Sequence, residues 1–240
     1  RPADAPEAQA VPASVLVRTA LQVWPILVIF GVVFGGIYGG LFTATEGAAI
    51  GNVLTFAITL VRKQMNWQRL MACVRTTAQT SGMIFLIFIG ADMINASLAL
   101  SQLPAQLADM VGHLQISPIA IMAGVMLFYV ILGCVMDEMS MILLTVPTLF
   151  PVIMGLDFWG LAPGDKALWF GILIVTVVEI GMIFPPVGLN VYIMNGLAKD
   201  VPMSETYKGV VPFLATDAIR LALLIAFPPL TLWLVHALTG

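Results

Sequence analysis

Charged side chains are scarce in this sequence. Its 240 residues include ten Lys or Arg and thirteen Asp or Glu, so 10% of the chain is charged, against about 25% in an ordinary soluble domain. So few charges cannot cover the surface of a soluble protein of this size. Because 60% of the residues are hydrophobic and the mean hydropathy is +1.02, the sequence predicts an integral membrane protein.

Other absences exclude whole classes of function. The net charge is −3 and the basic residues are scattered, so we expect no nucleic acid as a partner. The two cysteines, Cys73 and Cys134, show no CxxC or Cys/His spacing, which gives no indication of a disulfide framework or a zinc site. The chain has no GxxxxGK[ST], HExxH or GxSxG motif, so neither an ATP site nor a familiar hydrolase site is indicated.

Apolar segments dominate what is present, and they predict an all-α polytopic membrane protein. A membrane-spanning helix needs about 20 mostly apolar residues, and three of the segments are expected to be too short to cross unaided: 46–61, 140–154 and 187–198. The Lys and Arg residues of 62–75, compared with their absence from the loop 99–116, predict that 62–75 is cytoplasmic. The eight segments are 19–38, 46–61, 79–98, 117–133, 140–154, 167–183, 187–198 and 209–238.

One short break separates the fourth and fifth segments. The break reads CVMDEMS and places Asp137 and Glu138 between two short apolar arms, the second of which carries Pro147 and Pro151. This pattern predicts a re-entrant hairpin over 117–154 whose polar tip lies within the membrane, where free helix ends can hold an ion or a ligand. Two ordinary helices joined at the membrane surface are the alternative.

The stretch GMIFPPVGLN interrupts the next apolar region. Pro185 and Pro186 remove two backbone donors, while Gly181 and Gly188 relax the chain on either side. We therefore expect a discontinuous helix over 167–198, with freed carbonyl groups that a cation could satisfy. A simple proline kink is the alternative.

Two further features are interpreted as structural. Asp217 and Arg220 stand three residues apart on one helix face and are expected to pair with each other. The glycine-rich stretch 35–51 is expected to mediate close helix packing, with Thr43 and Glu46 forming a capping box for the helix that follows.

Four stretches together resemble the large membrane subunit of TRAP transporters (tripartite ATP-independent periplasmic transporters), of the wider ion transporter superfamily. The resemblance implies the C-terminal half of that subunit, one inverted repeat of an elevator-type secondary transporter; the N-terminal half is then a partner, as the start at Arg1 rather than Met also suggests. The stretches are GGIYGGLFTATEGAAIG (35–51), GCVMDEMSMILLTVPTLFPVIMGLD (133–157), GMIFPPVGLNVYIMNGLAKDVP (181–202) and FPPLTLWL (227–234).

We accordingly expect a division into four parts. Residues 1–17 are a linker or disordered, and 18–116 form transmembrane and scaffold or arm helices. Residues 117–198 form the transport (elevator) segment, with the re-entrant hairpin and the broken helix, and 199–240 form a loop and a C-terminal transmembrane helix.

The resemblance also implies site residues. In the family, sodium is bound largely by backbone carbonyls where a hairpin tip meets a broken helix. Carried over, this predicts sodium-binding carbonyls at Gly133, Gly181, Phe184 and Val187, with Asp137, Glu138, Pro185, Pro186 and Asn190 at the periphery of a substrate or ion site. This chain departs from many members by carrying Phe184 where they have Thr, which removes a hydroxyl ligand, and Ala44 where they have Pro.

The function implied is sodium-driven uptake of small organic anions, such as sialic acid or C4-dicarboxylates, across the bacterial inner membrane. The expected partners are a small four-helix membrane subunit, a periplasmic substrate-binding protein and membrane lipid, with Na⁺ as the coupling ion and no organic cofactor. Proton coupling through Glu179 or Asp137 is the alternative. A membrane-embedded hydrolase using Asp137 or Glu138 is disfavoured, because only His113 and His236 could assist and both lie near loops or the terminus. We expect a protein that is not an enzyme.

Overall fold

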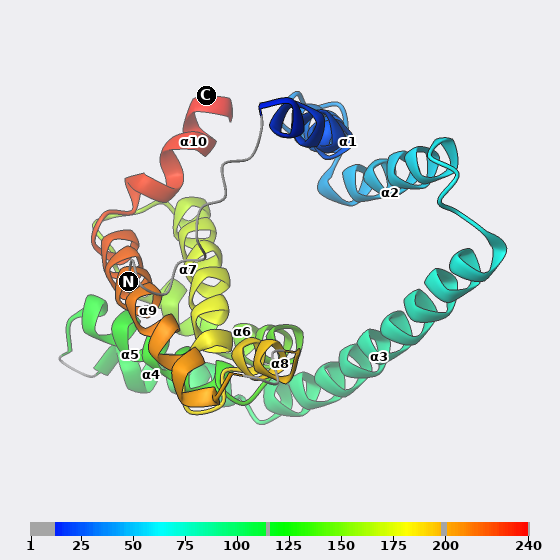
Figure 1. Cartoon of the computed structure of the whole chain (residues 1–240). Coiled ribbons are helices and arrows are strands. Elements are labelled where there is room, and N and C mark those ends of the chain that lie inside the picture. Colours follow the sequence, from blue (N-terminus) through cyan, green and yellow to red (C-terminus); the bar gives the residue numbers. More distant parts are fainter. Residues whose placement is uncertain (1–12, 114–115, 198–200, 240) are drawn as a thin grey trace. The chain divides into compact units, whose positions relative to one another are not determined.

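The computed structural model describes residues 13–113, 116–197 and 201–239, and within them all regular secondary structure is helical (Figure 1). Among the described residues, five helices are long and apolar enough to cross a membrane, namely α2, α3, α6, α7 and α9. The predicted helical membrane protein is therefore confirmed. The helices are α1 (Ala13–Tyr38), α2 (Ala44–Val61), α3 (Trp67–Leu100), α4 (Leu103–His113), α5 (Pro118–Gly133), α6 (Glu138–Gly155), α7 (Pro163–Ile183), α8 (Leu189–Leu197), α9 (Met203–Ala226) and α10 (Pro229–Thr239).

The chain packs as two units, Arg1–Ala78 and Gln79–Gly240. In the first, α1 packs against α2, whose start is fixed by the predicted capping box: Glu46 N donates to Thr43 Oγ1 and Thr43 N donates to Glu46 Oε2. A Cβ added at Gly47 would lie 3.0 Å from the Ile37 side chain. Glycine-mediated packing and the capping box are both confirmed.

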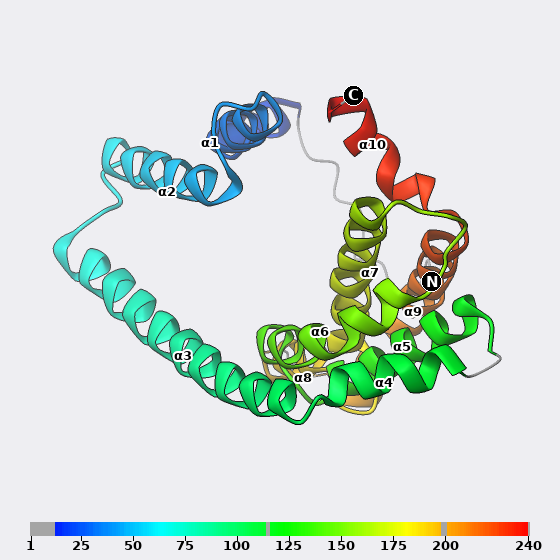
Figure 2. The same ribbon diagram turned by 180° about the vertical axis from the view of Figure 1, so that it is seen from behind.

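Helix α7 provides the centre of the second unit, and α5, α6, α8, α9 and α10 all pack against it, while α4 packs against α6 (Figure 2). The buried apolar side chains of α7 pack against those of α5 and form one hydrophobic core with them. The buried members of this contact are Trp169, Phe170, Leu173, Ile174, Val177 and Val178 from α7 and Met122, Met126 and Tyr129 from α5. The helix that carries the break is thus the best-anchored element of this unit.

Two side chains of α7 bond to the ends of other helices. Trp169 Nε1 donates to the carbonyl oxygen of Leu224 over 2.8 Å, a group that has no helical donor because Pro228, four residues later, lacks an N–H. The buried Lys166 donates to the carbonyl oxygens of Met154, at 3.2 Å, and Leu156, at the end of α6. A cation there suits the negative end of the helix dipole.

Three details of the helices differ from the sequence prediction. Helix α4 lies within the stretch predicted as a loop, and the apolar stretch 209–238 divides into α9 and α10 at Phe227 and Pro228. The segments predicted to be too short, 46–61 and 140–154, belong to helices of 18 residues that qualify as candidate spans. They are longer because capping residues start each helix ahead of its first strongly apolar turn. The described residues leave out 1–12 of the predicted linker, 114–115 of the predicted loop 99–116, residue 198 at the end of the predicted broken helix, and 199–200 at the start of the loop predicted after it.

Candidate functional site

The end of α5 and the end of α7 meet at two glycines. A Cβ added at Gly133 would lie 2.8 Å from the Cα of Gly181, and one added at Gly181 would lie 2.8 Å from the Cα of Gly133. Real Cβ atoms essentially never approach a backbone atom that closely, so only glycine at both positions permits this crossing. The contact places the segment after α5 directly beside the break after α7.

The predicted break is present between α7 and α8. Helix α7 ends at Ile183, and the backbone N–H of Phe184 turns back to the carbonyl oxygen of Gly181, 3.1 Å away. Gly188 adopts φ +50°, a backbone conformation that favours glycine, and α8 resumes at Leu189. The double proline explains the loss of the helix, since neither Pro185 nor Pro186 can donate to it.

Side chains from two other elements bond the carbonyl oxygens of this break. The thiol of Cys134, directly after α5, lies 3.2 Å from the carbonyl oxygen of Val130 in α5 and 3.7 Å from that of Pro185, so the two oxygens share its one proton. The hydroxyl of Tyr207, on α9, lies 2.8 Å from the carbonyl oxygen of Pro186 and 2.6 Å from that of Val187. The sequence analysis identified neither donor, because each lies far from the break along the chain.

Asp137 has a clear local role. It is the N-cap of α6, and its carboxylate accepts hydrogen bonds from the backbone N–H of Ser140, at 3.0 Å, and from the Ser140 hydroxyl, at 2.6 Å. An N-cap carboxylate satisfies a free N–H group at the positive end of the helix dipole. Asp137 therefore fixes where α6 begins.

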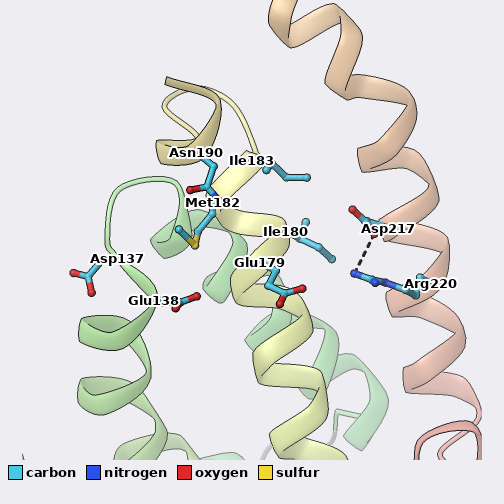
Figure 3. A pocket seen from close by; sticks show the side chains of 9 residues that line it. All are labelled: Asp137, Glu138, Glu179, Ile180, Met182, Ile183, Asn190, Asp217 and Arg220. Atoms are coloured by element: carbon cyan, nitrogen blue, oxygen red, sulfur yellow. Dashed lines mark ion pairs between the residues drawn. The ribbon is translucent and has the colours of Figure 1, made fainter. Parts of the chain in front are cut away.

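A cavity of about 670 Å³ opens beside the break (Figure 3). Asp137 and Glu138 border it from the start of α6, while Asp217 and Arg220 border it from α9. Arg220 Nη2 lies 3.1 Å from Asp217 Oδ1, which confirms the predicted pair. The lining comprises Asp137, Glu138, Glu179, Ile180, Met182, Ile183, Asn190, Asp217 and Arg220, so carboxylates outnumber cationic groups on its wall.

The predicted site residues thus fall into three neighbouring groups. Gly133 and Gly181 form the helix crossing; Phe184, Pro185, Pro186 and Val187 form the break; and Asp137, Glu138 and Asn190 line the cavity. Sequence reasoning left Glu179 open and treated Asp217 and Arg220 as purely structural, although all three line the same cavity. The sequence did contain a signal for these three residues, because each is an ionisable side chain within an apolar segment, and such residues often mark functional sites in membrane proteins.

These features define a multi-pass helical membrane protein with an interrupted helix beside a carboxylate-lined cavity. The family model for the tripartite ATP-independent periplasmic transporter, DctM component, matches residues 4–230. The chain belongs to this family, the large permease component of TRAP transporters, as the sequence analysis predicted.

Similar proteins include the sialic acid TRAP transporter large permease protein SiaM of Vibrio cholerae, 30% identical over 90% of this chain and 48% of the relative. The C4-dicarboxylate TRAP transporter large permease protein DctM of Rhodobacter capsulatus is 32% identical over 82% of this chain and 43% of the relative. The 2,3-diketo-L-gulonate TRAP transporter large permease protein YiaN of Escherichia coli is 25% identical over 78% and 43%. The chain spans about half the length of the curated relatives it matches. These relatives are named as permeases, which confirms the expectation of a family that is not enzymatic.

Proposed function

We propose that this chain is part of the permease subunit of a sodium-coupled, binding-protein-dependent secondary transporter that takes up small organic anions. The family match over residues 4–230 carries the proposal. The substrates in the names of the three relatives above are all organic acids. A periplasmic substrate-binding protein would deliver the anion, a small four-helix subunit would complete the permease, and the assembly would lie in the bacterial inner membrane.

The junction of α5 with the break supports sodium as the coupling ion. Interrupted helices in transporters offer carbonyl oxygens to cations near the middle of the membrane. The candidate ligands are the carbonyl groups of Gly133, Gly181, Phe184 and Val187. Phe184 offers only its backbone oxygen, so sodium selectivity here would rest on the arrangement of carbonyl groups.

An elevator mechanism is proposed for the movement. Helix α5 contains 16 residues, which corresponds to about 24 Å, less than the roughly 30 Å of a bilayer's hydrocarbon core. This length suits the first arm of a re-entrant hairpin with its tip between Gly133 and Glu138, and Pro147 and Pro151 lie within the second arm, α6. The chain would supply one inverted repeat, and the other half of the large subunit would supply the second.

Proton coupling is the second candidate, because the carboxylates of Glu138 and Glu179 share the cavity beside the break. Carboxylates on a cavity wall within a membrane protein are common proton carriers. Glu179→Gln is the informative variant, since it removes the proton site and alters no backbone carbonyl.

Uptake of radiolabelled organic acids tests the proposal. Proteoliposomes would hold the full-length large subunit with its small subunit, and the binding protein would be added outside. We expect uptake under an inward sodium gradient, none with potassium replacing sodium, and none without the binding protein. Glu179→Gln should retain sodium-driven uptake. Uptake driven by a proton gradient alone, and lost in Glu179→Gln, would contradict sodium coupling.

A further inference from the structure

We propose that the hydroxyl of Tyr207 holds the carbonyl groups of the break by hydrogen bonding and competes with sodium for the carbonyl oxygen of Val187. This inference rests on the proposed function. It assigns a positioning role to a residue on α9, outside both the hairpin and the break.

The hydroxyl group of Tyr207 faces two hydrogen-bond acceptors with a single proton. Its oxygen lies within 2.8 Å of the carbonyl oxygen of Pro186 and within 2.6 Å of that of Val187, yet a phenol has one proton to donate. Two consecutive carbonyl groups therefore converge on one hydroxyl. Such a concentration of negative partial charge favours a cation, and the single proton of Tyr207 offsets only part of it.

The neighbouring residue fixes the position of Tyr207 independently of its hydroxyl. Thr206 Oγ1 donates to Asn195 Oδ1 on α8 over 2.8 Å, and α9 packs against both α7 and α8. Removing the Tyr207 hydroxyl should therefore leave α9 and α8 in place. The variant would then lose only the hydrogen bond to the carbonyl groups of the break.

The hydrogen bond from Tyr207 affects sodium binding because both use the carbonyl oxygen of Val187. A carbonyl oxygen that accepts the Tyr207 proton is turned toward α9 and is less available to an ion. The hydrogen bond therefore stabilises the sodium-free state more than the sodium-bound state, and only such a difference shifts a binding equilibrium. Without the hydroxyl, the ion-free break loses a donor and sodium becomes its best partner.

The test compares Tyr207→Phe with the wild-type assembly in sodium titrations of uptake. We expect the half-saturating sodium concentration to fall between about twofold and tenfold, the range that corresponds to one net hydrogen bond. Tyr192→Phe is the matched control: it removes a phenol hydroxyl from α8, at a residue that is 63% exposed, and it should leave the half-saturating sodium concentration unchanged.

Sodium-dependent thermal unfolding of the same assembly gives a second measurement that does not require transport. At a given sodium concentration, the rise in melting temperature should be larger for Tyr207→Phe than for the wild type. An unchanged or higher half-saturating concentration in Tyr207→Phe, with a sodium-dependent wild type, overturns this inference alone. A wild type that responds to sodium in neither measurement overturns the proposed function and this inference together.

Discussion

The side-chain amide of Asn95 donates a hydrogen bond to the carbonyl oxygen of Leu143 over 2.9 Å. Pro147 stands four residues after Leu143 and has no N–H with which to satisfy that carbonyl group. A side chain of α3 therefore supplies the donor that α6 lacks. The amide cannot be flipped, because its oxygen would then face the oxygen of Leu143, and as a result Asn95 Oδ1 is left buried without a partner among the described residues.

Replacing Asn95 by Leu should reduce the stability of the assembled subunit by about 1–3 kcal/mol, the cost of leaving a buried carbonyl group without a donor. In a Pro147→Ala background the same replacement should cost much less, because the helix can then satisfy Leu143 itself. The measurement is a double-mutant cycle on the free energy of unfolding. Equal costs in the two backgrounds would contradict this account.

Replacing Gly133 by Ala should destabilise the protein by about 1–3 kcal/mol, as overpacking does, because the new methyl group meets the backbone of Gly181. Gly124→Ala on the same helix is the control, since nothing lies within 4 Å of the Cβ that it would add. Thermal unfolding of both variants checks this. The result also matters for transport assays: lost uptake in a Gly181 variant reports broken packing as well as any lost ion ligand. If Gly133→Ala is as stable as Gly124→Ala, the crossing is less tight than described.

Replacing Lys166 by Met should cost about 1.5–3 kcal/mol, the range for hydrogen bonds made by a charged group, because the carbonyl groups at the end of α6 lose their donor. Lys208→Met provides the comparison. Its ammonium group pairs with Glu205 on an exposed surface, where ion pairs contribute about 0–1 kcal/mol. Chemical unfolding of the two variants should rank them in this order, and the reverse order would argue against a role for Lys166 in ending α6.

Two substitutions at Asp137 separate capping from proton transfer. Asp137→Asn keeps an oxygen that can cap α6 and should preserve both stability and sodium-driven uptake, whereas Asp137→Ala should lose about 0.5–2 kcal/mol of stability. Unfolding and uptake measured on the same preparations provide the check. Full stability combined with abolished uptake in Asp137→Asn would instead assign the carboxylate to coupling.

Local sequence rules anticipated several parts of this structure. The Thr43 capping box and the Asp217–Arg220 pair each join residues three apart, and the double proline acts on its own helix, so all were visible from spacing. The bonds from Tyr207 and Cys134 to the break cross 20 and 51 residues. Nothing in the spacing of a tyrosine reveals which distant carbonyl group lacks a donor, so these contacts could not be predicted.

The missed helix boundaries have a physical reason as well. Helix α4 has 11 residues, LPAQLADMVGH, and its polar residues interrupt the apolar ones, so it did not register as an apolar segment. The break before α10 was missed because Phe227 and Pro228 lie within a continuous apolar run. Hydropathy reports how apolar a stretch is and does not register the missing N–H of Pro228, beside which α9 ends.

The bond from Trp169 to Leu224 has a consequence for how such sequences diverge. Pro228 leaves the carbonyl group of Leu224 without a helical donor, and Trp169 supplies one. A descendant that loses Pro228 no longer needs the indole N–H of Trp169. A descendant that loses Trp169 first is left with a carbonyl group at Leu224 that has no donor. Positions 169 and 228 should therefore change together, or in the order proline first, across the lineage. A pattern of this kind would show that the hydrogen bond between α7 and α9 is maintained because Pro228 has no N–H to donate to Leu224.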